Sequence, residues 1–330
     1  VYLEEEADAA GEGLLIIDNN NYDTKDGVTT RVPAGSTWNV KDLVLQNAGL
    51  LEMVSGTTLN LVGGGTITSD SDDNTDGMVW HNGSTISGLG AAFNIDNYTV
   101  ITVGAVSYTG DLTVGSNGRM THYDNSTTET YTMDFTVTGN LTIDAGGVIT
   151  ANELGYDADN GPGTPDAETK AAGSHGGIGG IRAFPISSST YGSLTAPVNI
   201  GSGGDGTVGG GAIRLTVSGL STINGDITAN GGGNHNRGNG AGGSVYITSG
   251  AITGTGNITA NGGSGSTEGG GGGGRVAVIL TTATANFTGY TGTSTAFGGE
   301  STNATKDGAA GTVYLEEEAD AAGEGLLIID

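Results

Sequence analysis

The chain has 330 residues, 35% of them hydrophobic and 14% charged, so it is long enough to bury a substantial core. Ten basic residues against 36 acidic ones give a net charge of −26, which argues against nucleic acids and anionic membrane surfaces as partners. The absence of cysteine excludes disulfides, thiol catalysis and cysteine-based metal sites. No apolar run approaches the roughly 18 residues that span a bilayer, so no membrane insertion is expected in this segment.

The first residues of the chain, VYLEEEADAAGEGLLIID (1–18), recur letter for letter at 313–330. Such self-similarity marks repeat architectures. We interpret 1–18 as the end of a preceding repeat and 313–330 as the start of the next, in a tandem array with a period of 312 residues (313 − 1). A first residue other than methionine favours this interpretation. The alternative is a discrete subunit with two copies of one strand, one of which docks into a neighbour. The predicted assembly interface consists of Val1, Tyr2, Leu3, Leu14, Ile16, Val313, Tyr314, Leu315, Leu326 and Ile328.

Residues 19–150 alternate apolar and polar positions, with turn signals every ten or so residues, as in STWNVKDLVLQNAGLLEMVSGTTLNLVGGGTITS. Alternation of this kind is typical of half-buried strands. Helix signals are nearly absent, and only TPDAETKAA (164–172) could form a turn or two of helix. The segment is therefore predicted to form β-solenoid coils.

An acidic stretch within this segment, DSDDNTDG (70–77), has the spacing of the first half of an EF-hand loop. Asp72, Asn74 and Asp76 would place three oxygen ligands on one side of a tight turn, with Asp70 or Asp73 in place of the missing twelfth-position glutamate. The pattern indicates a calcium site, and a solvated acidic turn is the alternative. No cofactor is required by any other motif.

Residues 151–312 are rich in glycine and repeat with a clear period. Four apolar strands begin at Ile213, Val245, Val276 and Val313, which are 32, 31 and 37 residues apart. A step near 31 residues with β-branched residues at alternate positions indicates a solenoid, in which stacking buries a continuous core. A second set of strands repeats with the same step, at Ile227 and Ile258. The long glycine runs between the strands are predicted to be loops on one side of the stack.

Coils of this kind stack about 4.8 Å apart, so about ten coils would give a rod on the order of 50 Å per repeat. Tandem immunoglobulin-like sandwiches are the rival fold. They repeat near 100 residues, which the shorter step contradicts.

The stretch YGSLTAPVNIGSGG…GGGAIRLTVSGLSTINGDITANGGG…GAGGSVYITSGAITGTGNITANGG…GGGGGGRVAVIL (191–280) resembles the glycine-rich parallel β-helix repeats of very large bacterial surface proteins of the filamentous-haemagglutinin sort. The likeness is looser over residues 29–150. The resemblance implies a parallel, right-handed β-helix displayed outside the cell. It also implies a scaffold, because such repeats bring no catalytic residue with them.

Parallel β-helices also carry polysaccharide lyases and hydrolases, so an enzyme has to be weighed. His175, with Asp157, Asp159 and Asp166 nearby in sequence, is the only plausible centre. Such enzymes need paired carboxylates at a set separation or a base that abstracts a proton. A histidine flanked by glycines is more often a hydrogen-bonded residue of a loop, and we therefore predict no enzyme.

The sequence as a whole predicts an all-β parallel β-solenoid that forms one repeat of a longer array. Its predicted partner is itself, end to end, and its predicted role is that of an extracellular filament or a cell-surface stalk. Two alternatives stay open. One is an adhesin that binds surface glycans or partner cells through its glycine-rich loops, and the less favoured one is a polysaccharide lyase or hydrolase.

Overall fold

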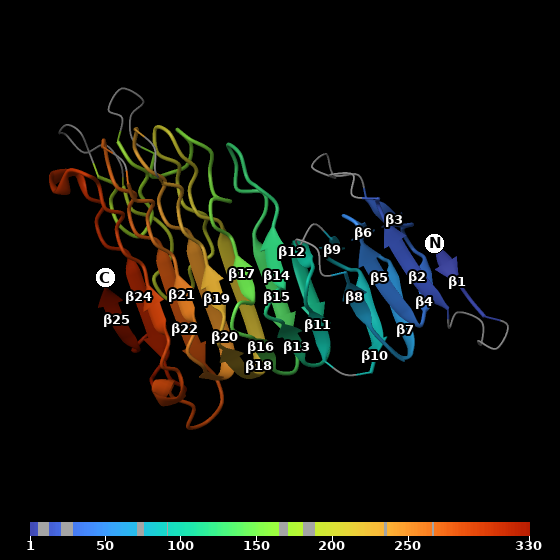
Figure 1. Cartoon of the computed structure of the whole chain (residues 1–330). Coiled ribbons are helices and arrows are strands. Elements are labelled where there is room, and N and C mark those ends of the chain that lie inside the picture. The colour runs from blue at the N-terminus through green and yellow to red at the C-terminus, as the bar shows by residue number, and fades with distance from the viewer. Residues whose placement is uncertain are drawn as a thin grey trace. The chain divides into compact units, whose positions relative to one another are not determined.

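The computed structural model describes residues 1–5, 13–20, 29–70, 76–90, 92–164, 171–180, 189–233, 236–265 and 267–330 (Figure 1). Over these residues the chain is all-β, as predicted. Within the described ranges, helix is limited to two 3-10 turns, η1 (Phe287–Gly289) and η2 (Ala304–Lys306), and residues 165–170 of the predicted helical turn lie outside these ranges. None of the helices in the described ranges could cross a membrane. The chain divides into unit 1 (Val1–Thr121, Asp134–Ile149, Val217–Gly225) and unit 2 (His122–Met133, Thr150–Thr216, Asp226–Asp330).

The strands of unit 1 are short and numerous. They are β1 (Tyr2–Leu3), β2 (Leu14–Asp18), β3 (Thr30–Val32), β4 (Thr37–Val40), β5 (Asp42–Gln46), β6 (Leu50–Met53), β7 (Thr58–Gly65), β8 (Ile67–Ser69), β9 (Gly77–His81), β10 (Thr85–Leu89), β11 (Phe93–Ile95), β12 (Thr99–Tyr108), β13 (Leu112–Val114) and β16 (Leu141–Ile143).

Four strands have residues in both units: β14 (Arg119–His122), β15 (Met133–Val137), β17 (Val148–Thr150) and β18 (Ala212–Ile223). The strands of unit 2 are β19 (Asp226–Thr228), β20 (Ser244–Thr253), β21 (Asn257–Thr259), β22 (Arg275–Leu280), β23 (Thr293–Thr295), β24 (Thr312–Glu316) and β25 (Leu326–Ile329).

Parallel pairing organises the first part of unit 1. Three successive sets of three strands pair in the same order: β2–β5–β8, β3–β6–β9 and β4–β7–β10. Leu43 of β5, for example, lies opposite Leu15 on one side and Ile67 on the other. The parallel pairing expected from the alternating pattern is therefore confirmed here.

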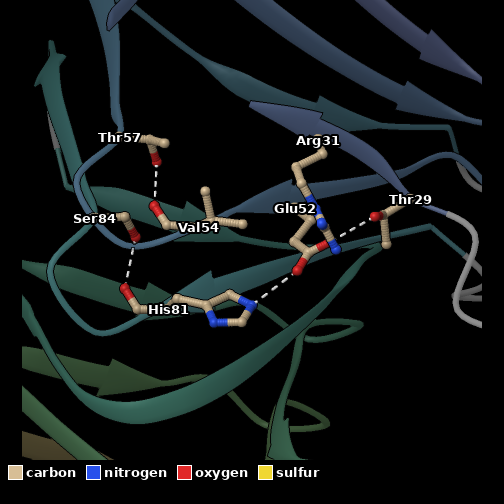
Figure 2. A network of polar contacts seen from close by, with 7 residues as sticks. All are labelled: Thr29, Arg31, Glu52, Val54, Thr57, His81 and Ser84. Carbon is tan, nitrogen blue, oxygen red and sulfur yellow. Dashed lines mark hydrogen bonds and ion pairs between the residues drawn. The ribbon is translucent and has the colours of Figure 1, made fainter. Parts of the chain in front are cut away.

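The alternating pattern also explains which side chains are buried. In β5, Leu43 and Leu45 are fully buried, while Val44 between them is only half-buried. Turns between strands are closed by hydroxyl side chains. Thr57 Oγ1 donates to the Val54 carbonyl in the turn after β6, and Ser84 Oγ donates to the His81 carbonyl in the turn after β9, both at 2.7 Å (Figure 2).

Aromatic side chains fill the middle of unit 1. The ring of Trp80, on β9, is fully buried. Its centroid lies 5.8 Å from that of Phe93, 6.3 Å from that of Tyr108 and 5.5 Å from that of Phe135, in each case with the rings edge to face. This geometry is the favoured one for aromatic pairs. The unit thus has a conventional apolar core.

The repeating step predicted for the glycine-rich half is confirmed in unit 2. Ile227 of β19 lies opposite Ile258 of β21 in a parallel pair. In the neighbouring ladder Val276 of β22 lies opposite Val245 of β20 on one side and Val313 of β24 on the other. The residues that repeat in sequence therefore occupy equivalent positions on adjacent strands.

In the described residues the glycine runs of unit 2 lie outside the strands, as expected of loops, but much of each run is buried inside the unit. Residues 238–243 and 269–274 are almost entirely buried. A Cβ on Gly240 would overlap the carbonyl oxygen of Val208, one on Gly271 that of Gly240, and one on Gly308 that of Gly271. Glycine is thus required because the segments pack backbone against backbone, and none of these three has positive φ.

Backbone hydrogen bonds tie these glycine segments together with a period of three residues. Gly270 donates to the Lys306 carbonyl and Gly273 to the Ala309 carbonyl, each at 3.0 Å. Gly272, which lies between them in sequence, donates to the carbonyl oxygen of Gly173 in a third segment, at 2.9 Å. A three-residue step is what an extended helix with three residues per turn gives. The same step recurs in the donor–acceptor pairs Gly240–Gly232 and Gly243–Ala229, Gly271–Gly263 and Gly274–Ala260, and Gly308–Gly299 and Gly311–Ala296. Unit 2 thus contains a hydrogen-bonded glycine bundle, made of residues 171–180, 199–211, 229–233, 236–243, 260–265, 267–274 and 296–311.

Candidate functional site: the duplicated hairpin

Both copies of the duplicated segment fold into the same antiparallel hairpin. In the first copy Tyr2 lies opposite Leu15, and Leu3 opposite Leu14. In the second copy, Tyr314 lies opposite Leu327, the same pair 312 residues later. Both copies place an apolar strand on each side of the acidic, glycine-containing stretch EEEADAAGEG, which supplies the connection.

A hydrogen bond across the hairpin is also repeated. The backbone N–H of Gly13 donates to the Tyr2 hydroxyl at 3.1 Å, and that of Gly325 donates to the Tyr314 hydroxyl at 2.9 Å. A Cβ on Gly13 would overlap the Leu3 carbonyl oxygen, so glycine is required at this point. Two copies in different surroundings therefore reach the same local structure.

The two hairpins differ in which strand is paired with the rest of the protein. In the first copy β2 pairs in parallel with β5, and β1 is the outer strand. In the second copy β24, the equivalent of β1, pairs in parallel with β22, and β25 is the outer strand. Each copy thus lacks the neighbour that the other copy has.

The exposure of the side chains follows the same division. Val1 and Tyr2 are 75% and 41% exposed, but their equivalents Val313 and Tyr314 are 0% and 3% exposed. The other strand shows the reverse. Leu15 and Ile17 are 8% and 6% exposed. Their equivalents, Leu327 and Ile329, are 44% and 73% exposed.

The predicted interface residues all lie in these two hairpins, on different faces. Val1, Tyr2, Leu3 and Leu326 are exposed, Val313 and Tyr314 are buried, and Leu14, Ile16, Leu315 and Ile328 are half-buried. Leu15, Ile17, Leu327 and Ile329, which are buried in the first copy and exposed in the second, were not among the predicted interface residues. In the run LLII every residue is apolar, so alternation could not identify the inward face.

The aspartate that ends the duplicated segment makes different contacts in its two copies. Asp18 accepts hydrogen bonds from the backbone N–H of Asn20 at 2.8 Å, from Gln46 Nε2 at 2.9 Å and from Asn47 Nδ2 at 3.2 Å. The Gln46 bond, followed by the Asn20 and Asn47 bonds, lowers the pKa of Asp18. Asp330 instead accepts the backbone N–H of Ala296 at 2.7 Å.

The predicted calcium turn is described only in part. Asp72, Asp73 and Asn74 lie outside the described residues. Asp76 is buried, and its two oxygens accept the Gly49 N–H at 2.8 Å and the Ser69 hydroxyl at 2.6 Å. Asp70 Oδ2 accepts the Asn47 N–H at 3.2 Å. Calcium binding stays a prediction, and Asp76 has a structural role that needs no ion. Over the described ranges, no three acidic or histidine side chains gather as metal ligands would.

His175 lies inside unit 2. The ring is fully buried, and Nδ1–H donates to the Gly242 carbonyl at 2.8 Å. Burial lowers the pKa of His175 to about 4, and the nearby charge of Arg275 contributes to this lowering against the effect of the Gly242 bond. The ring packs on Tyr191, with centroids 4.6 Å apart. In the described part of the chain no carboxylate is paired with it. This geometry gives His175 a packing role.

A charged network lies along one ladder of unit 1 (Figure 2). Glu52 of β6 accepts Arg31 Nε at 2.9 Å and the Thr29 hydroxyl at 2.7 Å, and His81 Nε2 lies 3.0 Å from its other oxygen. Burial alone would raise the pKa of Glu52. The hydrogen bonds from Thr29 and Arg31 and the charges of Arg31 and His81 outweigh burial and lower it. Arg31 belongs to β3, Thr29 directly precedes β3, and His81 belongs to β9. Parallel pairing places both of these strands beside β6.

Comparison of the chain with family models, with curated proteins and with solved structures finds no match. The functional argument therefore depends on the geometry of the chain alone. The paired hairpins, identical in sequence and complementary in exposure, are the feature from which a function can be argued.

Proposed function

We propose that the chain is a structural repeat of an extracellular filament or cell-surface stalk. Copies would follow one another every 312 residues, and the segment shared by residues 1–18 and 313–330 would form a single hairpin at each boundary. The observation that carries this proposal is the complementary pairing of the two copies. In an array, β24 would keep its partner β22, and β25 would gain the partner that β2 has in β5.

The proposed architecture is a β-solenoid that continues from one repeat into the next. Its support is the repeated strand order of unit 1 and the regular ladders of unit 2. The boundary hairpin is antiparallel, so the coils would be interrupted once per repeat by a strand pair of opposite sense. An array of this kind leaves no apolar strand edge exposed between repeats, which removes a site of uncontrolled pairing.

Mechanical stiffness and resistance to proteolysis would be the function of such an array. Apolar side chains hold unit 1, and backbone hydrogen bonds between glycine segments hold much of unit 2. The net charge of −26 would keep neighbouring filaments apart and soluble. The proposal assigns no catalysis to the chain.

An adhesin remains the second hypothesis of the sequence analysis. It depended on glycine-rich loops as the binding surface, and residues 238–243 and 269–274 of these runs are buried, which leaves only exposed parts such as Asn236, Arg237 and Ser264 for binding. We therefore favour the structural role over glycan binding through these segments.

Chains with one, two and three repeats test the proposal. A two-repeat chain consists of residues 1–330 followed directly by residues 19–330. Electron microscopy of negatively stained molecules should show a length that grows by a constant increment with each repeat, along one axis. Separate particles joined at variable angles would contradict continuous stacking.

A further inference from the structure

We infer that separate copies of this chain can join end to end, because the C-terminal hairpin of one copy can replace the N-terminal hairpin of the next. This inference rests on the proposed function, since it uses the same shared hairpin. It adds a partner, which is a second, unlinked copy of the chain. Binding of this kind is strand addition to a sheet edge, in which backbone bonds give affinity and side-chain pockets give register.

The apolar side chains define the register of the proposed junction. Leu15 and Ile17 lie opposite Leu43 and Leu45 of β5, and both are buried there. A hairpin supplied by another copy would place its Leu327 and Ile329 at these positions, because its sequence and internal register are the same. Leu327 and Ile329 are exposed in their own chain, so they are available for this contact.

A polar group supports the same junction independently. The carboxylate of Asp330 accepts one N–H, from Ala296, in the donor chain. In the place of Asp18 it would also accept the side-chain donors of Gln46 and Asn47 of the second chain. A carboxylate has about four acceptor positions, so the two sets of donors can be satisfied together. The aspartate would then bridge the two copies.

The surface beside β1 is hollowed and partly apolar. An open groove of about 650 Å³ lies there, lined by Tyr2, Leu15, Trp38, Val40 and their neighbours. Its lining is mostly apolar, and Trp38 and Val40 belong to β4. In a junction this groove would adjoin the shared hairpin and face the preceding copy.

Replacement expels the acceptor's own hairpin, so the number of paired edges is the same before and after. Association of unmodified chains is therefore expected to be weak, and an acceptor whose own hairpin cannot pair should associate strongly. The duplicated sequence provides a matched test, because the same substitution can be placed in either copy.

In the acceptor variant, Leu15→Asp with Ile17→Asp, charges at two buried positions should detach the N-terminal hairpin and open the edge of β5, while the C-terminal hairpin stays intact. In the donor variant, Leu327→Asp with Ile329→Asp, the same changes fall on exposed residues and should leave the fold unchanged. Sedimentation at about 0.15 M salt or above, where repulsion between the acidic chains is screened, measures the mass.

The acceptor variant should form head-to-tail oligomers with a several-fold increase in mass that rises with concentration. The donor variant should stay monomeric. The chain with all four substitutions controls for nonspecific aggregation at the opened edge and should also stay monomeric, with the circular dichroism of the acceptor variant. Addition of the peptide VYLEEEADAAGEGLLIID should cap the acceptor variant and return it to a monomer.

An acceptor variant that remains monomeric while folded overturns the inference, and so does oligomerisation of the four-substitution chain to the same mass. Either result leaves the proposed function standing if the two- and three-repeat chains still grow by a constant increment. If those chains do not, the proposed function itself is wrong.

Discussion

The apolar core of unit 1 and the glycine bundle of unit 2 are both buried interiors, but they are filled in opposite ways. In unit 1 large side chains such as Trp80 and Phe135 occupy the space between strands. In the bundle glycine predominates, and extended segments contact one another through backbone atoms. Burial of apolar area stabilises the first interior, and satisfied hydrogen bonds stabilise the second.

This difference determines what each interior tolerates. An apolar core loses stability mainly when a side chain is removed, because a cavity remains. The glycine bundle should lose stability mainly when a side chain is added, because no space exists for it. Four predictions sharpen this contrast, and each can be measured by urea unfolding.

Removal of the largest buried side chain should have the largest effect. Trp80→Ala should destabilise unit 1 by about 3–5 kcal/mol, because it leaves a cavity among Phe93, Tyr108 and Phe135. Trp80→Phe should cost clearly less. Equal losses in the two variants would mean that the cavity is not the cause.

Acid should weaken unit 2 through His175. The pKa of this group is lowered to about 4 from its usual 6.5, so its contribution is complete above pH 6.5 and is lost as the pH falls toward 4. The loss should be about 3 kcal/mol. His175→Phe should remove this part of the pH dependence. An NMR titration of the ring with a midpoint near 6.5 in the folded protein would show that the prediction is wrong.

Addition of one methyl group inside the bundle should be costly. Gly271→Ala should destabilise unit 2 by about 1–3 kcal/mol, because the new Cβ overlaps the carbonyl oxygen of Gly240. Gly232→Ala is the matched control, since its Cβ would lie 3.1 Å from the nearest atom, the Val208 oxygen. Similar unfolding midpoints for the two variants would argue against backbone packing as the reason for the glycines.

The smallest effect is expected from the charged network of unit 1. The pKa of Glu52 is lowered in the fold, so its contribution is present above its unfolded pKa and is lost as the pH falls through the folded value. Glu52→Gln should cost about 1 kcal/mol at neutral pH, a modest value because Arg31 is largely exposed. The variant should differ less from the parent chain in acid than at neutral pH. If the free energies of unfolding of the variant and the parent chain differed by the same amount in acid and at neutral pH, the shape of the Glu52 side chain, and not its charge, would be the cause.

Much of the strand arrangement could be predicted from the sequence, and the glycine bundle could not. Ile227 and Ile258 carry side chains at matched positions, so the pairing of their strands followed from the repeat. Glycine has no side chain whose pattern could separate a loop from a packed extended segment. The only signal was the placement of glycine runs directly after ITAN at 227–230 and 258–261, and the ITAN at 149–152 is followed by Glu153 instead.

The candidate site was predictable to a similar degree. Identity of 1–18 with 313–330 pointed to an assembly interface, but not to a hairpin with one open edge in each copy. The stretch EEEADAAGEG between two apolar strands could have indicated the turn. The hydrogen bonds of Asp18 and Asp330 had no sequence signal, because the donors, among them Gln46 for Asp18 and Ala296 for Asp330, are distant in the chain.

Hydrogen exchange of a two-repeat chain, residues 1–330 followed directly by residues 19–330, tests the central claim most directly. The hairpin at its middle should have partners on both sides, so the amides of both strands should exchange slowly. In the hairpins at the two ends, one strand should exchange much faster. A middle hairpin that exchanges as fast as those at the ends would contradict the account of one shared hairpin at each repeat boundary.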